Sequence, residues 1–166
     1  MYSLKSLQTY QLNKKVIQQI LKIKDQTWKF GINSQTEYFN SNVKKNDIHN
    51  FVFLKSSLVG YTFLSKKNLF IRNKKIRILY LDSMVVNSNF RGKKIASLLM
   101  NFNNHIIFDY DYFCVLSCDK KMVKFYKKFL WSKMSQNIKI SRDIKPNLIK
   151  MCFNKKKLIK HENKKK

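Results

Sequence analysis

The chain has 166 residues, of which 44% are hydrophobic and 14% aromatic, and its formal net charge is +26 at pH 7. This length and apolar content exclude a disordered chain and predict one folded domain over residues 1–153, followed by a lysine-rich tail over residues 154–166. Because no apolar run is long enough to span a bilayer and the first residues lack the apolar segment of a signal peptide, we expect a cytoplasmic protein without a membrane partner.

The positive charge comes almost entirely from lysine, since 31 of the 35 basic residues are lysines and only four are arginines. A surface selected for phosphate or base contacts is expected to use more arginine, whose guanidinium group matches those partners. We therefore attribute most of the charge to an overall bias in composition. A basic nucleic-acid-binding module stays open as an alternative.

The N-terminal half predicts a strand, a helix and two hairpins. Residues 3–10 form the strand, and Asn13 is a plausible N-cap for a helix over residues 14–24, whose apolar side chains share one face. A looser helical or loop segment follows at residues 34–43. Four strand segments then form hairpins with turns at residues 56–57 and 73–74: residues 50–55 with 58–65, and residues 69–72 with 75–86.

The C-terminal half contains the strongest helix pattern. Ile95, Leu98, Leu99, Phe102 and Ile106 fall on one face of a helix that we expect to begin within two residues of Arg91. Residues 112–118 form a strand, and Asp119 caps a further helix that carries Tyr126. Short strands follow at residues 135–140 and 148–153. The alternation of strands and helices predicts an α/β fold with a mixed sheet and helices on both faces.

Three cysteines, Cys114, Cys118 and Cys152, form no CxxC pair. An odd number at such spacing argues against a disulfide framework or a structural zinc site, so we expect reduced thiols and no metal.

The turn between the long strand and the strongest helix has the character of an anion site. The first N–H groups of a helix lack partners within the helix and lie at the positive end of its dipole. Arg91, Lys93 and Lys94 add positive charge, and such a turn can bind a pyrophosphate. Gly92 and Ala96 are small residues in a chain with only three glycines, which suggests that a ligand approaches the backbone closely. The alternative is a solvated basic turn.

Arg91-Gly92-Lys93-Lys94-Ile95-Ala96 resembles the acyl-CoA-binding signature (Q/R)-x-x-G-x-(G/A) of the GNAT superfamily of N-acetyltransferases. The segment from Phe125 to Trp131 resembles the family's F-Y-x-x-x-G-(F/W) motif. The resemblance covers residues 49–131 and is closest to the branch that contains the aminoglycoside 2′-N-acetyltransferases. Two positions differ, because Lys94 and Leu130 stand where the motifs have glycine.

The resemblance implies the GNAT fold, with a splayed pair of strands in its central sheet, and direct acetyl transfer from acetyl-CoA to a primary amine of a small-molecule or peptide acceptor in a ternary complex. It also implies two sets of site residues. Asp82 would relay the amine proton, and Tyr126 would meet the departing thiolate. The expected coenzyme-binding residues are Met84, Val85, Val86, Arg91, Gly92, Lys93, Lys94, Ile95, Ala96 and Ser97.

Several alternatives stay open at this level. Asp82 could pair with a nearby lysine, Tyr126 could be a half-buried packing residue, and the protein could bind acyl-CoA without catalysis. We expect a monomer or a homodimer. Only nine residues are acidic, which argues against a polycationic aminoglycoside as the acceptor.

Overall fold

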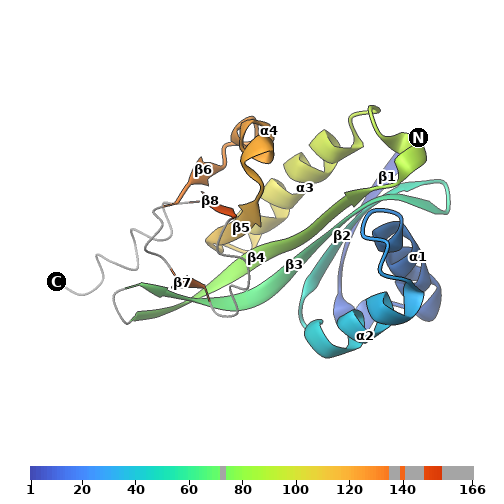
Figure 1. Cartoon of the computed structure of the whole chain (residues 1–166), viewed down its shortest axis with the longest axis horizontal. Coiled ribbons are helices and arrows are strands. Elements are labelled where there is room, and N and C mark those ends of the chain that lie inside the picture. The colour runs from blue at the N-terminus through green and yellow to red at the C-terminus, as the bar shows by residue number, and fades with distance from the viewer. Residues whose placement is uncertain (72–73, 135–138, 141–147, 155–166) are drawn as a thin grey trace. The chain divides into compact units, whose positions relative to one another are not determined.

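The computed structural model describes residues 1–71, 74–134, 139–140 and 148–154. The chain divides into two compact units, which are described separately below. Figure 1 labels their helices and strands. The first comprises Met1–Ser65 and Ser83–Asn103, and the second comprises Lys66–Asp82 and Asn104–Lys166. Across both, the strand order in the sheet is β1-β2-β3-β4-β5-β8-β6, with β7 pairing with β3. In the described ranges, no helix has the length and apolar content that crossing a membrane would require.

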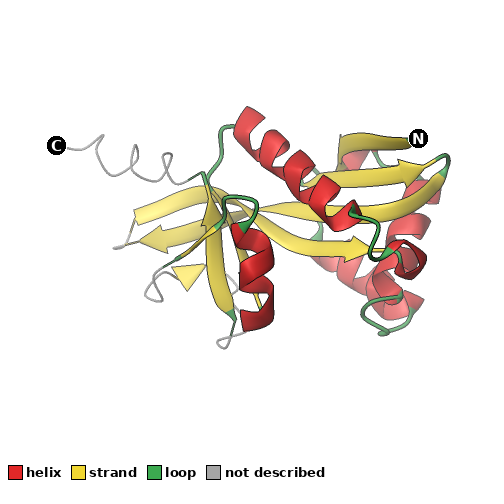
Figure 2. Ribbon diagram, turned by 90° about the horizontal axis from the view of Figure 1, so that it is seen from above, coloured by secondary structure: helices red, strands yellow, loops and turns green. Residues whose placement is uncertain are grey.

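The first unit is an antiparallel sheet with helices on both faces (Figure 2). It takes in part or all of seven elements: β1 (Tyr2–Gln8), α1 (Lys14–Asp25), α2 (Ile32–Asn42), β2 (Ile48–Leu54), β3 (Ser57–Ile71), β4 (Lys74–Val86) and α3 (Ile95–Asp109). The N-cap prediction for α1 is confirmed, since Asn13 Oδ1 accepts a hydrogen bond of 2.9 Å from the Val16 N–H.

Alternating side chains of the strands supply the two layers of the core in this unit. On β2, Phe51 and Phe53 belong to the cluster that contains Ile20 and Ile23 of α1. The intervening Val52 belongs to a second cluster, which α3 contributes to. This second cluster contains the buried residues Val52, Val59, Ile95 and Leu99, with Leu54, Met84, Val86, Phe90 and Leu98 packed against them. The period of two along each strand thus assigns one face to α1 and the other to α3.

Gly60 of β3 is the point where α3 comes closest to the sheet. A Cβ atom at this position would lie 2.7 Å from Ile95 Cγ2 and 2.9 Å from Leu99 Cδ1, distances that real Cβ contacts do not reach. The missing side chain therefore allows the first turn of α3 to pack directly on the β3 backbone.

Buried polar contacts also join the elements of this unit. His49 of β2 is fully buried, with its Nε2 2.9 Å from Thr9 Oγ1 and its Nδ1 2.8 Å from the Tyr61 hydroxyl. Asn103 Oδ1 of α3 accepts hydrogen bonds from Asn50 Nδ2 on β2, at 2.5 Å, and from Thr62 Oγ1 on β3, at 2.7 Å. These hydrogen bonds join β2, β3 and α3 through buried side chains, although Asn50 Oδ1 and Asn103 Nδ2 are buried without a hydrogen-bond partner.

The second unit is built around β5 (Cys114–Cys118), whose neighbours run in both directions. Its parallel ladder with β4 spans Leu79–Leu81 and Cys114–Leu116. β8 (Ile149–Phe153) pairs antiparallel with β5 and also with the short β6 (Ser132–Lys133). α4 (Val123–Lys127) and β7 (Lys139–Ile140) complete the described elements. With parallel and antiparallel pairs in one sheet and helices on both faces of it, the predicted mixed α/β fold is confirmed.

Two sequence predictions need correction in detail, and a third lies largely outside the described residues. The predicted strands at residues 58–65 and 69–72 form one strand as far as Ile71, because the polar segment between them continues the extended backbone of β3. Residue 72 lies outside the described ranges. Asp119 makes no side-chain capping hydrogen bond, and a 3₁₀ turn over Lys120–Met122 precedes α4. Of the strand predicted at residues 135–140, only residues 139–140 lie within the described ranges; residue 73 of the predicted turn lies outside them.

The prediction that α3 begins within two residues of Arg91 is wrong. The helix begins at Ile95, and the first hydrogen bond of its ladder runs from the Leu98 N–H to the Lys94 carbonyl. The helix starts later than predicted because two residues before it have a left-handed backbone: φ is +77° at Gly92 and +60° at Lys94. Left-handed residues cannot continue a right-handed helix, so the helix starts only after the second of them.

The buried His49 should make the fold sensitive to acid. Burial lowers the pKa of His49 from 6.5 to about 3, and the charge of Lys24 acts in the same direction. Below pH 6.5, His49 binds a proton in the unfolded chain but stays neutral in the folded chain. The folded state therefore loses stability as the pH falls. We expect a loss of about 2 kcal/mol in unfolding free energy from this residue between pH 7.5 and 5.0.

Urea denaturation at these pH values, compared between the unmodified protein and a His49→Gln variant, checks this effect. The variant should lose less stability on acidification than the unmodified protein, by about 2 kcal/mol. His105 is exposed, so His105→Gln is the matched control and should keep the original pH dependence. Equal pH dependence in all three proteins would show that His49 does not govern acid stability.

The left-handed Lys94 should carry a measurable strain. A residue with a Cβ atom costs about 1–2 kcal/mol in this conformation, whereas glycine adopts it freely but loses more entropy on folding. Lys94→Gly should therefore be more stable than Lys94→Ala by about 1 kcal/mol, although both variants remove the same charge. Thermal and urea unfolding of the two variants measures the difference. An Ala variant as stable as the Gly variant would mean that no strain is stored at this position.

Candidate functional site

The segment that follows β4 is an exposed turn fastened to the sheet at its first residue. The Asn87 N–H donates to the Val59 carbonyl at 3.0 Å, and the Asn87 side chain accepts a hydrogen bond from the Asn89 N–H at 3.1 Å. A 3₁₀ turn over Ser88–Phe90 leads into four exposed residues, Arg91, Gly92, Lys93 and Lys94. The turn therefore presents its backbone and its three cations to solvent.

The N-terminus of α3 lies directly after this turn. Because the first bond of the helix is donated by Leu98, the N–H groups of Ile95, Ala96 and Ser97 occupy the three positions that have no partner within a helix. The first turn of α3 contains no acidic residue. Uncompensated N–H groups at the positive end of a helix, beside three basic side chains, form an arrangement that suits a phosphate group.

Ile95 contributes to this arrangement through its backbone alone. Its side chain is 2% exposed and packs in the cluster with Val52, Val59 and Leu99. The end of β4 likewise has its side chains packed in the core and offers only its backbone to a ligand. Met84 and Val86 pack against the α3 cluster, and Val85 is buried in the α1 cluster. A ligand at Met84–Val86 would therefore meet backbone N–H and carbonyl groups.

Two of the basic side chains of the turn contact the protein itself. Arg91 Nη2 donates to Thr27 Oγ1, just after the end of α1, at 3.3 Å. Lys93 Nζ lies 4.9 Å from the centre of the Phe90 ring. These contacts hold positive charge close to the turn. The contact with Thr27 was not predicted, because no local pattern links Arg91 to a residue 64 positions away.

Both positions where this chain lacks a motif glycine keep a left-handed backbone. Lys94 has φ +60° and Leu130 has φ +65°. Leu130 follows α4, and the adjacent Trp131 N–H donates to the Tyr126 carbonyl at 3.3 Å. Left-handed residues commonly end a helix in this way. The departures therefore change side chains without changing the backbone conformation for which glycine is suited.

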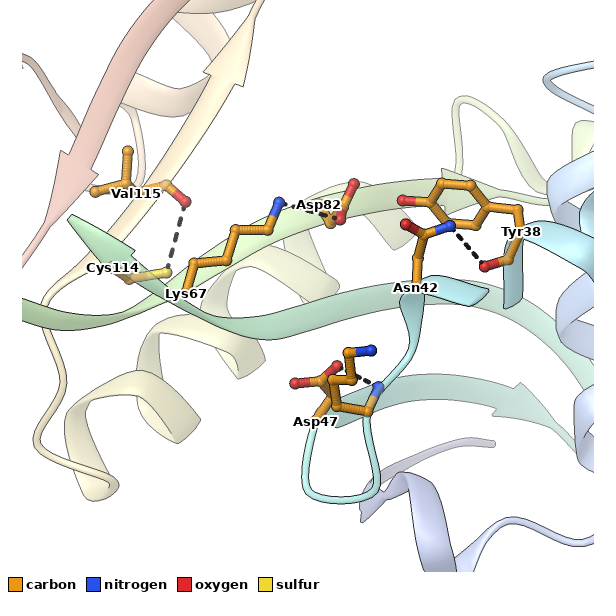
Figure 3. Close-up of polar contacts among 8 residues, drawn as sticks. Tyr38, Asn42, Asp47, Lys67, Asp82, Cys114 and Val115 are labelled. Atoms are coloured by element: carbon orange, nitrogen blue, oxygen red, sulfur yellow. Dashed lines mark hydrogen bonds and ion pairs between the residues drawn. The ribbon is translucent and has the colours of Figure 1, made fainter. Parts of the chain in front are cut away.

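Asp82 of β4, in the second unit, forms an ion pair with Lys67 on the neighbouring strand β3 (Figure 3). Its Oδ2 lies 3.6 Å from Lys67 Nζ of β3, and each of the two side chains is 22% exposed. The same ammonium group lies 3.9 Å from the centre of the Tyr80 ring. The pairing with a lysine, which the sequence left open as an alternative, is present. Lys67 itself was not predicted. The predicted hairpin could have pointed to it, because long side chains on neighbouring strands reach one another diagonally.

Tyr126 lies on α4 and is 8% exposed, between the rings of Phe125 and Trp131. Burial raises the pKa of its hydroxyl to about 12, and Cys118 and Tyr80 act in the same direction. Tyr126 is thus a buried, neutral hydroxyl near Tyr80, which stands two residues before Asp82 on β4. The predicted catalytic pair therefore shares the second unit, whereas the predicted coenzyme-binding residues all lie in the first.

The remaining candidates have structural explanations. All three cysteines are buried and none of them forms a disulfide. Burial raises the pKa of the Cys118 thiol, which disfavours the nucleophilic thiolate. His105 pairs with Asp109 at 3.3 Å on the exposed face of α3. In the part of the chain that the structure describes, no group of three His, Cys, Asp or Glu side chains could hold a metal ion.

The fold of this chain also occurs in known proteins. Three solved structures share the fold: ElaA of Escherichia coli (15% identity, TM-score 0.69, 93% of this chain and 100% of that one), an acyl-CoA N-acyltransferase of Pseudomonas aeruginosa (11%, 0.70, 93% and 100%), and the PaiA N-acetyltransferase of Thermoplasma acidophilum in complex with coenzyme A (15%, 0.57, 90% and 98%). Among curated protein sequences, none matches the chain.

The family evidence comes from the sequence itself. The model of the Acetyltransferase (GNAT) family matches residues 17–130, which include both the turn after β4 and the α4 segment with Tyr126. This match covers more than half of the chain and spans elements of both units. The chain therefore belongs to the Acetyltransferase (GNAT) family.

Proposed function

We propose that the protein is an acetyl-CoA-dependent N-acetyltransferase that transfers the acetyl group directly to a primary amine while both substrates are bound. The observation that carries this proposal is the start of α3. There, three N–H groups without helical partners, an exposed glycine with a positive φ and three cations follow the last residues of β4. In the proposal, this turn binds the pyrophosphate of the coenzyme, and the backbone of Met84–Val86 binds its pantetheine arm.

The main contribution of the protein would then be positioning. An acetyl thioester and an amine held side by side react as if in one molecule, which removes much of the entropic barrier. A backbone N–H at the end of β4 would stabilise the negative charge that develops on the thioester oxygen. Both roles need backbone groups in fixed positions, and the buried side chains of Ile95 and Val85 hold that backbone in place.

Asp82 is proposed to take the proton of the attacking amine. An alkylammonium group with a pKa near 10 is deprotonated about once in a thousand molecules at pH 7, so a base is useful. The 22% exposure of the Asp82 side chain leaves it accessible to a water molecule or to the substrate. In this proposal, Lys67 orients the carboxylate.

Tyr126 is proposed to stabilise the departing thiolate by donating a hydrogen bond. With a pKa of about 12, the hydroxyl keeps its proton at neutral pH. Full transfer of that proton to a thiolate, whose conjugate acid has a pKa of about 8.5, would cost roughly 5 kcal/mol. A hydrogen bond stabilises the negative charge without that cost, and solvent can supply the proton afterwards.

The acceptor is proposed to carry at most one ammonium group, or an anionic group. The sequence likeness to the aminoglycoside 2′-N-acetyltransferases points to a polycationic acceptor, but a chain with nine acidic residues and a charge of +26 repels such a molecule. We further propose that residues 1–153 act as one domain in a cytoplasmic monomer or homodimer.

The test is release of coenzyme A from acetyl-CoA in the presence of a panel of primary amines, with the product identified by mass spectrometry. For an accepted amine, Asp82→Asn should lower kcat by about 10²-fold or more, as loss of a general base does. Tyr126→Phe should lower kcat about tenfold, and both variants should bind acetyl-CoA as the unmodified protein does.

Matched controls separate catalysis from folding. Asp119→Asn and Tyr110→Phe make the same chemical changes at exposed positions and should leave kcat unchanged. Unchanged turnover in both Asp82→Asn and Tyr126→Phe would remove these residues from the mechanism. Tight binding of acetyl-CoA without turnover of any amine would instead identify a coenzyme-binding protein that lacks catalysis.

A further inference from the structure

The first unit contains a cavity of about 450 Å³ that is lined by none of the residues assigned above to the coenzyme or to catalysis. It lies between α1, the turn that joins β2 to β3, and the end of β4. Ten residues line it: Lys15, Gln18, Gln19, Lys22, Ile23, Gln26, Ser56, Ser57, Leu58 and Asn87. Its volume lies within the range of small-molecule binding sites, about 300–1,000 Å³.

The cavity follows from the amphipathic pattern of α1. The apolar residues Ile20, Leu21 and Ile23 face the sheet, so the polar stripe beside them runs along the cavity. One member of that stripe is fixed, because Gln19 Oε1 accepts a hydrogen bond of 2.9 Å from the Leu58 N–H at the start of β3. This bond holds α1 to the hairpin, and it leaves the amide nitrogen of Gln19 as a donor.

The chemistry of the lining is that of a site for an anion. Lys15 and Lys22 stand two helical turns apart on the same side of α1, and none of the ten lining residues is acidic. Hydroxyl groups of Ser56 and Ser57, together with the amide groups of the glutamines, supply further hydrogen-bond donors. Leu58 and Ile23 add apolar surface, which an organic group of the ligand can cover.

We propose that this cavity binds a small organic phosphate. A phosphate group has the charge that two lysines can pair with and enough oxygens to accept hydrogen bonds from several neutral donors at once. A simple carboxylate would leave part of this donor set unused. The cavity is larger than a phosphate ion, and its apolar surface accommodates the organic part of the ligand.

The site adjoins the turn that is proposed to bind the coenzyme. Asn87 lines the cavity and is the residue before the turn, and Gln26 lines it next to Thr27, which Arg91 contacts. Two sources of the phosphate therefore share the same chemistry: the nucleotide end of the coenzyme, and a separate phosphorylated molecule. Only the first source rests on the proposed function.

The test is isothermal titration calorimetry of the full chain with adenosine 3′,5′-bisphosphate at physiological ionic strength. The unmodified protein should bind it, and the double variant Lys15→Gln/Lys22→Gln should bind it at least tenfold more weakly. The matched control is Lys14→Gln/Lys29→Gln, which removes the same two charges from exposed positions outside the cavity and should change the affinity less than twofold. Because Lys14 and Lys29 do not line the cavity, the control variant measures the effect of the general positive charge alone.

Absence of binding to the unmodified protein would overturn the proposal, and so would an equal loss of affinity in both double variants. A titration in the presence of saturating coenzyme A identifies the source. Displacement of the bisphosphate together with weaker coenzyme A binding by Lys15→Gln/Lys22→Gln assigns the site to the coenzyme, and simultaneous binding assigns it to a separate molecule. Because no acceptor amine is present, these results do not depend on whether the protein catalyses acetyl transfer.

Discussion

The close approach of α3 to Gly60 is the constraint on which the candidate site depends. Ile95 is both the first residue of α3 and one of the two residues that occupy the space where a Gly60 side chain would lie. Its burial therefore fixes the start of the helix against the sheet. The positions of the N–H groups in the first turn are then fixed as well, because the helix axis and the first residue together determine them.

The turn before α3 meets this constraint with two left-handed residues, Gly92 and Lys94. Because Lys94 has a Cβ atom, the left-handed conformation is less favourable for it than for glycine, and the turn is strained at this residue. The same holds at Leu130 after α4. A strained conformation persists only where the surrounding structure determines it, and such positions often cluster at functional sites. In this chain, Lys94 and Leu130 coincide with the glycine positions of the family motifs, whereas Lys55, Asp111 and Asn154 are left-handed at other places.

Much of the fold could be predicted from the sequence, because alternation along β2 and the helical period of α1 and α3 reflect which side chains are buried. The turn after β4 was predictable for a similar reason, since Gly92 and the basic residues are adjacent in the chain. The later start of α3 was not, because a lysine at position 94 gives no sign of the left-handed backbone that delays the helix. Nor were the contacts of Lys67 with Asp82 and of Arg91 with Thr27, which depend on the register of strands and on the path of α1.

The central claim, that the turn after β4 binds the coenzyme, is tested most directly by the affinity for acetyl-CoA of two glycine variants. Gly92 and Gly31 are both exposed, both have a positive φ, and in both cases an added Cβ would meet no atom within 4 Å. Gly92→Ala and Gly31→Ala therefore introduce a similar backbone strain at two places, only one of which lies in the turn. We predict that calorimetry will show at least tenfold weaker binding for Gly92→Ala and unchanged binding for Gly31→Ala; equal affinity in the two variants, or no binding to the unmodified protein, would contradict the account.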